Sequence, residues 1–318
     1  MKLEEQVLIH NPVFANLFLQ GPVLVLGSGG LIGRALTEWL HLRNFTVLEV
    51  KGRAHIDLRI PHSLDQFNSS NVQYVFFLAA EVGGARFLEN PHRQLDIIEN
   101  NLRIYQNVFP WLESRGIPFL FTSSYMQHMG NSYGVIKRLG ETWIKELSSS
   151  VRNASLPDQL SRPTLASRTG GRVARFYNVY DVETRGGERR HVINDWVDGC
   201  HRSGRVVSRS DGTEIRQFLH ASDAAQALGL MMLLHKHLEP VTDVASGRWV
   251  TLRQLADEMQ QVLPDSCTFH FDQGVLAPAR ERLDPRQDSL LYHYFRPSVT
   301  LRDGLRRIAQ DEYARKTR

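Results

Sequence analysis

Tyr133 and Lys137 are the pair of residues whose types and spacing point most directly to chemistry. They stand four positions apart in a segment with helical periodicity, so both side chains lie on one face of a helix. A phenol normally titrates too far above neutral pH to exchange protons there, and a neighbouring ammonium group stabilises its phenolate. The pair therefore predicts a tyrosine that exchanges a proton with a substrate oxygen, whereas the alternative is a surface pair on an amphipathic helix.

A short hydroxyl run precedes this pair. Thr122, Ser123 and Ser124 come at the end of a predicted strand. Ligands of open α/β sheets bind at the carboxyl ends of the strands. A serine at this place can hydrogen-bond the same substrate oxygen as the tyrosine.

Three glycines near the start of the chain have the spacing of a dinucleotide-binding turn. Gly27, Gly30 and Gly33 lie between a short apolar run and a helical pattern. They allow a tight turn, a close approach of the backbone to a pyrophosphate, and close packing of helix on strand. The free N–H groups and dipole of the helix N-terminus then favour the phosphates. The alternative is an ordinary strand-to-helix turn.

Cations near the end of the second predicted strand favour NADP(H) over NAD(H). Lys51 and Arg53 follow this strand, and Arg34 directly follows the last glycine. A base at this place accepts a 2′-phosphate, whereas an acid binds the ribose hydroxyl. Glu49 is the competing acid, so NAD(H) stays the alternative.

The elements that must position these residues alternate between strands and helices. Apolar runs predict strands at 22–26, 45–50, 72–78, 117–121 and 172–177, and helical periodicity covers 31–43, 95–114 and 134–147. Such alternation implies right-handed crossovers and a parallel sheet. The fold class predicted is therefore α/β, a Rossmann-type doubly wound parallel sheet with a smaller α/β lobe.

Two lobes are expected because the pattern changes near residue 180. Residues 1–180 are predicted to form the NAD(P)-binding domain, to which 216–245 return, and 181–318 the substrate-binding lobe. Residues 1–20 are expected to form a short helix or arm. Residues 150–171 are polar and aperiodic, which is typical of an exposed mobile loop.

Composition excludes several other classes of protein. The net charge of the 318 residues is +4 and is spread along the chain, which argues against a nucleic-acid binder. Cys200 and Cys267 are too few for a disulfide framework or a zinc knuckle. Met126, His128 and Met129 have no carboxylate or cysteine at ligand spacing, so no metal is expected. With no apolar run of membrane length and no signal peptide, we expect a cytoplasmic protein.

Taken together, the motifs resemble the extended short-chain dehydrogenases/reductases, in their NAD(P)-dependent nucleotide-sugar epimerase/dehydratase group. The matching segments lie mostly between residues 22 and 225, with a further similarity at 296–307. They are 27–33, 57–58, 77–84, Thr122–Ser124, Tyr133–Lys137, Arg175–Tyr180 and Arg216–Asp223.

This resemblance implies roles for particular residues. Ser123, Tyr133 and Lys137 would be catalytic, with His191 as a further acid/base. Cofactor contacts would come from Gly27, Gly30, Leu31, Ile32, Gly33, Lys51, Arg53, Asp57, Leu58, Leu78, Ala79, Ala80, Tyr133, Lys137 and Val179. Substrate contacts would come from Val82, Gly83, Ser124, Tyr125, Asn178, His191 and Arg216, the last on a diphosphate.

Within the group, segments 79–84 and 190–193 are most similar to the GDP-sugar enzymes, GDP-fucose synthase and GDP-mannose 3,5-epimerase. Tyr125 stands where these epimerases have a cysteine, which argues against double epimerisation. The usual Tyr-Gly-Pro is Tyr180-Asp181-Val182 here, which suggests an unusual substrate or a more open pocket. For His191 the alternative is a surface loop histidine.

The sequence thus predicts an NAD(P)-dependent reductase or epimerase of a nucleotide-activated 4-keto sugar, with hydride transfer at C4. Two alternatives stay open: a 4-epimerase with tightly bound NAD, and a non-enzymatic dinucleotide sensor that keeps only the fold. The resemblance also implies a homodimer through the helices at 95–114 and 134–147.

Overall fold

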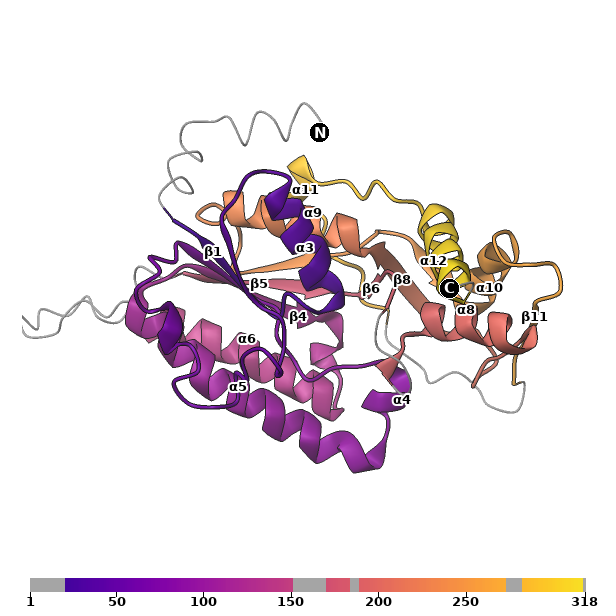
Figure 1. Cartoon of the computed structure of the whole chain (residues 1–318), viewed down its shortest axis with the longest axis horizontal. Coiled ribbons are helices and arrows are strands. Elements are labelled where there is room, and N and C mark those ends of the chain that lie inside the picture. The colour runs from indigo at the N-terminus through magenta and orange to yellow at the C-terminus, as the bar shows by residue number, and fades with distance from the viewer. Residues whose placement is uncertain (1–20, 151–169, 184–188, 273–281, 317–318) are drawn as a thin grey trace, which may run out of the picture.

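A six-stranded parallel sheet forms the centre of the larger lobe (Figure 1). The computed structural model describes residues 21–150, 170–183, 189–272 and 282–316; the predictions for 1–20 and for nearly all of 150–171 lie outside them. Its strand order is β2-β1-β3-β4-β5-β9. The strands are β1 (Val23–Leu26), β2 (Val47–Val50), β3 (Tyr74–Phe77), β4 (Phe119–Ser124), β5 (Gly171–Phe176) and β9 (Val241–Val244). The predicted Rossmann-type fold class is confirmed.

Helices cover both faces of this sheet, which is why its central strands β1 and β3 are apolar and buried along their whole length. The helices α5 (Gln94–Arg115) and α6 (Ser132–Ser150) lie on one face, and α3 (Leu31–His41) and α9 (Ala221–Leu233) on the other (Figure 1). All four residues of β1 and of β3 are buried. Parallel strands buried on both faces read as continuous apolar runs, and these runs are what the sequence displayed.

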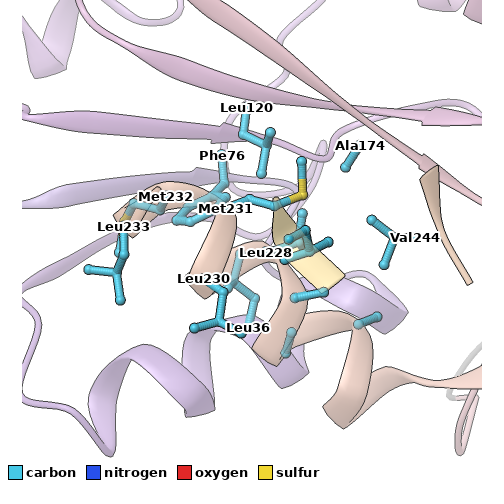
Figure 2. Close-up of a cluster of buried hydrophobic side chains, with 14 of the residues drawn as sticks. Leu36, Phe76, Leu120, Ala174, Leu228, Leu230, Met231, Met232, Leu233 and Val244 are labelled. Atoms are coloured by element: carbon cyan, nitrogen blue, oxygen red, sulfur yellow. The ribbon is translucent and has the colours of Figure 1, made fainter. Parts of the chain in front are cut away.

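The face under α3 and α9 holds one of the large hydrophobic clusters. Figure 2 shows Phe76 of β3 and Leu120 of β4 beside a row of side chains from α9. The two helices approach so closely that a Cβ on Gly229 would lie 2.3 Å from the ring of Trp39. The residues of α9 are therefore part of the core of the larger lobe, although they follow it late in the sequence.

A smaller lobe is built around short strands and three helices. One sheet has the order β10-β8-β6, and β11 pairs with β7 in parallel. The strands are β6 (Asn178–Tyr180), β7 (Arg205–Val207), β8 (Ile215–His220), β10 (Trp249–Thr251) and β11 (Thr268–His270), and the helices are α8 (Val192–Ser203), α10 (Leu252–Gln260) and α12 (Leu301–Lys316). Strand β8 belongs to this small sheet, and α9 follows it at once and returns the chain to the large sheet.

The remaining described elements are short. They are α4 (Ala85–Leu88), α11 (Leu291–Tyr294) and the 3₁₀ turns η1 (Asp65–Phe67), η2 (Pro91–Arg93) and η3 (Tyr125–His128). The two cysteines form a single disulfide between α8 and the segment before β11, Cys200–Cys267, with Cα atoms 5.4 Å apart. None of the helices in the described ranges has the length and apolar character needed to cross a membrane.

Candidate functional site

The glycine turn has the geometry that a dinucleotide pyrophosphate requires. Gly27 has a φ of +94°, in the left-handed region that favours glycine. A Cβ on Gly33 would lie only 2.2 Å from the carbonyl oxygen of Gly27, so α3 packs directly on the turn. Within the described residues, the buried hydroxyl of Ser28 has no hydrogen-bond partner. An orphaned hydroxyl beside the free N–H groups of a helix N-terminus fits a phosphate ligand.

A cavity of about 580 Å³ extends from this turn to Tyr133 and His191. Most residues predicted to contact cofactor or substrate line it, and three predicted substrate residues do not: Tyr125, Asn178 and Arg216. The predicted residues in its wall are Gly27, Gly30, Leu31, Ile32, Gly33, Lys51, Arg53, Asp57, Leu58, Leu78, Ala79, Ala80, Val82, Gly83, Ser123, Ser124, Tyr133, Lys137, Val179 and His191.

Tyr133 and Lys137 project from the first turns of α6 into the wall of this cavity. Lys137 is 3% exposed, and its Nζ donates a hydrogen bond to the carbonyl oxygen of Thr122 at 2.8 Å. This ammonium lies 5.7 Å from the centroid of the Tyr133 ring. Burial lowers the pKa of Lys137 to about 8, although the charge of Glu141 opposes the shift. Burial raises the pKa of Tyr133, and a hydrogen bond with Ser124 opposes that rise.

The two serines at the end of β4 have different partners. Ser123 donates its hydroxyl proton to Oε1 of Glu141 at 2.5 Å. The Ser124 hydroxyl instead hydrogen-bonds Tyr133 and accepts the N–H of Met126 at 3.2 Å. Both serines line the cavity, and Ser124 is the one that opposes the rise in the pKa of Tyr133.

Glu141 is a residue of this site that sequence reasoning missed. Its Oε1 accepts hydrogen bonds from Nε of Arg175, at 2.8 Å, and from the hydroxyl of Ser123. Its carboxylate is nearly buried and lies one helical turn beyond Lys137. The spacing of four between Lys137 and Glu141 was a signal that could have found it.

All three residues of the predicted cation cluster, Arg34, Lys51 and Arg53, line this cavity. Lys51 is exposed and lines the wall. Arg34 donates to the carbonyl oxygen of Val182 at 2.8 Å, which ties the first helix to the smaller lobe. The hydrogen bonds from Arg59 hold the pKa of Asp57 below its usual range, so this acid is ionised and paired.

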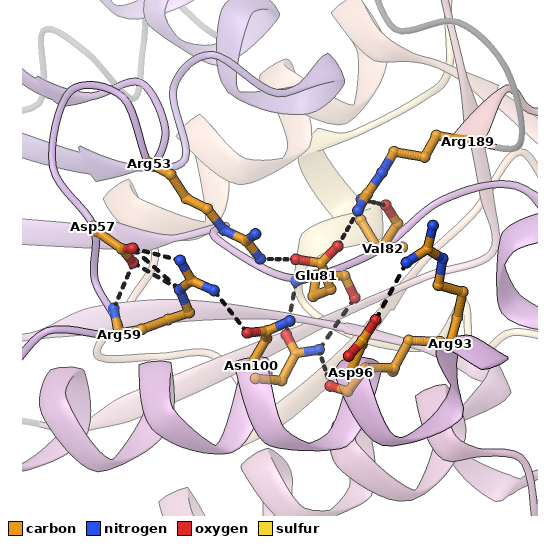
Figure 3. A network of polar contacts seen from close by, with 11 residues as sticks. Arg53, Asp57, Arg59, Glu81, Val82, Arg93, Asp96, Asn100 and Arg189 are labelled. Carbon is orange, nitrogen blue, oxygen red and sulfur yellow. Dashed lines mark hydrogen bonds and ion pairs between the residues drawn. The ribbon is translucent and has the colours of Figure 1, made fainter.

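The buried side chain of Glu81 is part of the cavity wall. Figure 3 shows it between Arg53 and Arg189, with an ion pair to each. Asn101 fixes its main chain, accepting the N–H of Glu81 at 2.9 Å and donating to its carbonyl oxygen at 3.1 Å. Glu81 and Arg189 are 108 positions apart, so no local pattern could reveal the pair.

Opposite the sheet, His191 forms part of the wall contributed by the smaller lobe. Its side chain is 41% exposed and its Nδ1 contacts the carboxylate of Glu183. Glu183 also lines the cavity and was not predicted.

The three predicted residues outside the cavity have other contacts. Tyr125 is buried and stacks on Tyr177 with ring centroids 4.7 Å apart. The Asn178 amide donates to the carbonyl oxygen of Gln217 at 3.2 Å, and the Arg216 guanidinium to the carbonyl oxygen of its neighbour Ile215 at 2.8 Å. No group of three His, Cys, Asp or Glu side chains suited to a metal ion occurs in the part of the chain that the structure describes.

Comparison with known proteins gives one family. The model of the NAD dependent epimerase/dehydratase family matches residues 23–245. Among curated proteins, GDP-L-fucose synthase 1 of Arabidopsis thaliana is 27% identical over 305 residues, which cover 89% of this chain and 90% of that protein.

Two solved structures share the fold. A GDP-L-fucose synthetase of Naegleria fowleri has a TM-score of 0.74 at 16% identity, over 93% of this chain and 94% of that one. The GDP-mannoheptose C4 reductase MlghC of Campylobacter jejuni, with NADP bound, also has a TM-score of 0.74, at 18% identity, over 92% of this chain and 98% of that one.

Proposed function

Because the chain belongs to the NAD dependent epimerase/dehydratase family, and so to the NAD(P)-dependent enzymes of nucleotide sugars, we propose that it reduces a nucleotide-activated 4-keto deoxysugar. The observation that carries this proposal is one cavity in which the glycine turn, Tyr133 and Lys137 meet. The sugar would carry GDP, because GDP-L-fucose synthases are among the similar curated proteins.

The proton for the new hydroxyl would come from Tyr133. The dinucleotide, when bound, supplies the hydride that reduces the C4 carbonyl. The carbonyl oxygen gains negative charge in this step and becomes far more basic than a phenolate, so a phenol of raised pKa is a competent acid for it. Lys137, held by the carbonyl oxygen of Thr122, would stabilise the phenolate that remains.

We assign the serine of this group to Ser124 in place of Ser123. The hydrogen bond between Ser124 and Tyr133 supports this assignment, because one substrate oxygen can then contact both hydroxyls. Ser123 would act through Glu141, which it joins to the strand.

For the cofactor we propose NADP(H). Lys51 in the cavity wall supports it, and MlghC has NADP bound. Glu49, one position before the end of β2, is the acid that would favour NAD(H).

For the sugar, the proposal keeps Val82, Gly83, Ser124 and His191 as contacts because they line the cavity. Contact of Asn178 and Arg216 with the substrate rests on the family resemblance, since both lie on neighbouring strands outside the cavity wall. Tyr125 is held against Tyr177, so His191 would be the acid/base for any epimerisation next to the keto carbon.

The direct test mixes purified protein with NADPH and GDP-4-keto-6-deoxymannose and follows the absorbance of the reduced nicotinamide. We expect its loss in proportion to product. Absence of turnover with any 4-keto nucleotide sugar would refute the proposal. A 4-epimerase would instead co-purify with NAD and consume no NADPH, and a sensor would keep its biological activity as the Tyr133→Phe protein.

A homodimer is proposed as well. Leu95, Val135 and Leu139 are exposed apolar side chains at the start of α5 and on α6, which supports an interface there. Light scattering in solution should give twice the chain mass of 36.4 kDa.

A further inference from the structure

Glu183 is a buried carboxylate in the cavity wall that the proposed reaction does not use. It is 8% exposed. It follows Asp181 and Val182, at which the chain departs from the Tyr-Gly-Pro of its family. One carboxylate oxygen, Oε2, accepts the main-chain N–H of His191 at 3.0 Å, and the other, Oε1, contacts Nδ1 of the same residue. The carboxylate thus contacts both the main chain and the ring of His191, which lines the cavity.

Hydrogen bonds with Asn194 fix the main chain at Glu183. Its main-chain N–H donates to Oδ1 of Asn194 at 3.2 Å, and the Asn194 amide donates to the carbonyl oxygen of Asp181 at 2.8 Å. His191 is the N-cap of α8, so the carboxylate lies at a helix N-terminus, where an anion is stabilised. Hydrogen bonds therefore hold Glu183 both through its main chain and through its carboxylate.

Main-chain contacts with the larger lobe also fix the segment that carries His191. The N–H of Gly84 donates to the carbonyl oxygen of Arg189 at 3.0 Å. A Cβ on Gly84 would lie only 1.9 Å from the carbonyl oxygen of Arg190, so no other residue permits this approach. The loop after β3 consequently holds residues 189–191 against the cavity.

We propose that Glu183 is a positioning residue that holds the proton on Nδ1 of His191 and turns Nε2 toward the substrate. This inference rests on the proposed function, because it needs a keto sugar in the cavity. The hydrogen bond that one ring nitrogen of a histidine makes decides which of the two nitrogens carries the proton. With Nδ1–H donated to Glu183, Nε2 has the lone pair that a general base needs.

The step that this arrangement serves is proton exchange at the carbon next to the keto group. Nε2 takes the proton, the C–H bond breaks, and its electron pair forms the C=C bond of an enolate whose negative charge goes to the former keto oxygen. Tyr133 and Ser124 would hydrogen-bond that oxygen, as in the proposed reduction. Glu183 stabilises the imidazolium as an ion pair, and return of a proton from Nε2 to the carbon reforms the C–H bond.

The test measures deuterium uptake apart from hydride transfer. The protein loaded with NADP⁺ is incubated with GDP-4-keto-6-deoxymannose in D₂O, and the recovered sugar is analysed by mass spectrometry. Without a reduced nicotinamide, only the exchange proceeds. We expect the wild type to incorporate deuterium, and Glu183→Gln to do so roughly 10- to 100-fold more slowly, the range for losing a carboxylate that orients a functional histidine. NADPH oxidation by Glu183→Gln should fall by a smaller factor than exchange does, since Tyr133 supplies the proton for that step.

Controls separate positioning from folding. Gln at 183 keeps an oxygen to accept the N–H of His191, so a purely structural role would survive Glu183→Gln. Asp195→Asn removes another carboxylate from the first turn of α8, one paired with Arg86, and should leave exchange unchanged. His191→Asn should abolish exchange, and adding Glu183→Gln to it should slow nothing further. If Glu183→Gln does not fold, Glu183→Asp should slow exchange because it withdraws the carboxylate by one methylene.

The outcomes distinguish failure of the role proposed for Glu183 from failure of the proposed function. Exchange by Glu183→Gln at the wild-type rate overturns the role of Glu183, and so does a wild type that oxidises NADPH without exchanging. A wild type that neither exchanges nor oxidises NADPH with any 4-keto sugar overturns the proposed function itself.

Discussion

The two walls of the cavity are built in different ways. The wall on the larger lobe consists of main-chain turns at the ends of β1 and β3, of Ser124 at the end of β4, and of the start of α6. The wall on the smaller lobe includes Glu183, Arg189 and His191, whose side chains have charged or polar partners: Glu183 contacts His191, and Arg189 pairs with Glu81 of the larger lobe. One wall depends on the backbone and local spacing, and the other on contacts between side chains.

This difference predicts different sensitivities. On the larger lobe, a single atom added or removed should change cofactor binding or proton transfer, because the main chain and side chains there are closely packed. On the smaller lobe, the paired charges should tune one step and leave cofactor binding alone. The substitutions below test the first wall, from the largest expected effect to the smallest, and so sharpen or break the contrast with the second.

Removal of the phenolic hydroxyl should have the largest effect. In Tyr133→Phe we expect kcat to fall by about 10³-fold, within the range for loss of a general acid. The affinity for NADPH, measured by fluorescence titration, should stay within about threefold because the glycine turn is untouched. A Tyr133→Phe protein with kcat near that of the wild type would remove the phenol from the mechanism.

A methyl group at the glycine turn should come next. Gly33→Ala would place a Cβ 2.2 Å from the carbonyl oxygen of Gly27, so the turn must shift away from the pyrophosphate. We expect the Kd for NADPH to rise by about 100-fold, a cost of about 3 kcal/mol. Gly130→Ala is the matched control, because a Cβ there meets nothing within 4 Å and the residue is not part of the cavity wall. Equal effects of the two substitutions would show that Gly33 has no special place.

The buried ammonium should make stability depend on pH. The pKa of Lys137 is lowered in the folded protein to about 8, so between that value and its usual 10.5 the unfolded chain binds more protons. The stability of the wild type should therefore rise with pH in this window, relative to Lys137→Met. Urea denaturation should show the advantage of Lys137→Met shrinking by about 2 kcal/mol between pH 7 and 9.5. A constant difference would mean that Lys137 is not buried in solution.

The two serines should separate activity from stability, with the smallest effects. Ser124→Ala should lower kcat by about tenfold, since one hydrogen bond to the reacting oxygen is lost. Its unfolding free energy should change little. Ser123→Ala should keep kcat within about threefold and lose about 1–3 kcal/mol of stability, because the buried Glu141 loses a donor. The reverse result would return the catalytic place to Ser123.

The contrast between the walls also explains what the sequence could predict. Alternation of apolar runs and helical periodicity predicted five of the six strands of the parallel sheet, all but β9, because burial on both faces leaves a strong local pattern. The turn at Gly27, the pair Tyr133 and Lys137, and the run ending at Ser124 were found because each is a local motif. Which of two adjacent serines adjoins the phenol depends on where the strand pleat falls, and a shift of one residue reverses the answer.

The other wall had no such local pattern. Glu81 and Arg189 meet only through the packing of the lobes, and Glu183 meets His191 across residues that have no regular period. The expected substrate contacts at Asn178 and Arg216 came from resemblance, and the structure directs both side chains to backbone carbonyls. Charge pairs distant in sequence cannot be deduced from spacing alone.

The central claim is that Tyr133 protonates an oxygen while hydride reaches the carbon that bears it. The most direct measurement uses NADPH deuterated at the transferring position with GDP-4-keto-6-deoxymannose, and locates the label by nuclear magnetic resonance. We predict deuterium on C4 of the product formed by the wild type and almost none with Tyr133→Phe over the same time. Label absent from C4 in the wild-type product, or equal labelling by both proteins, would contradict the account.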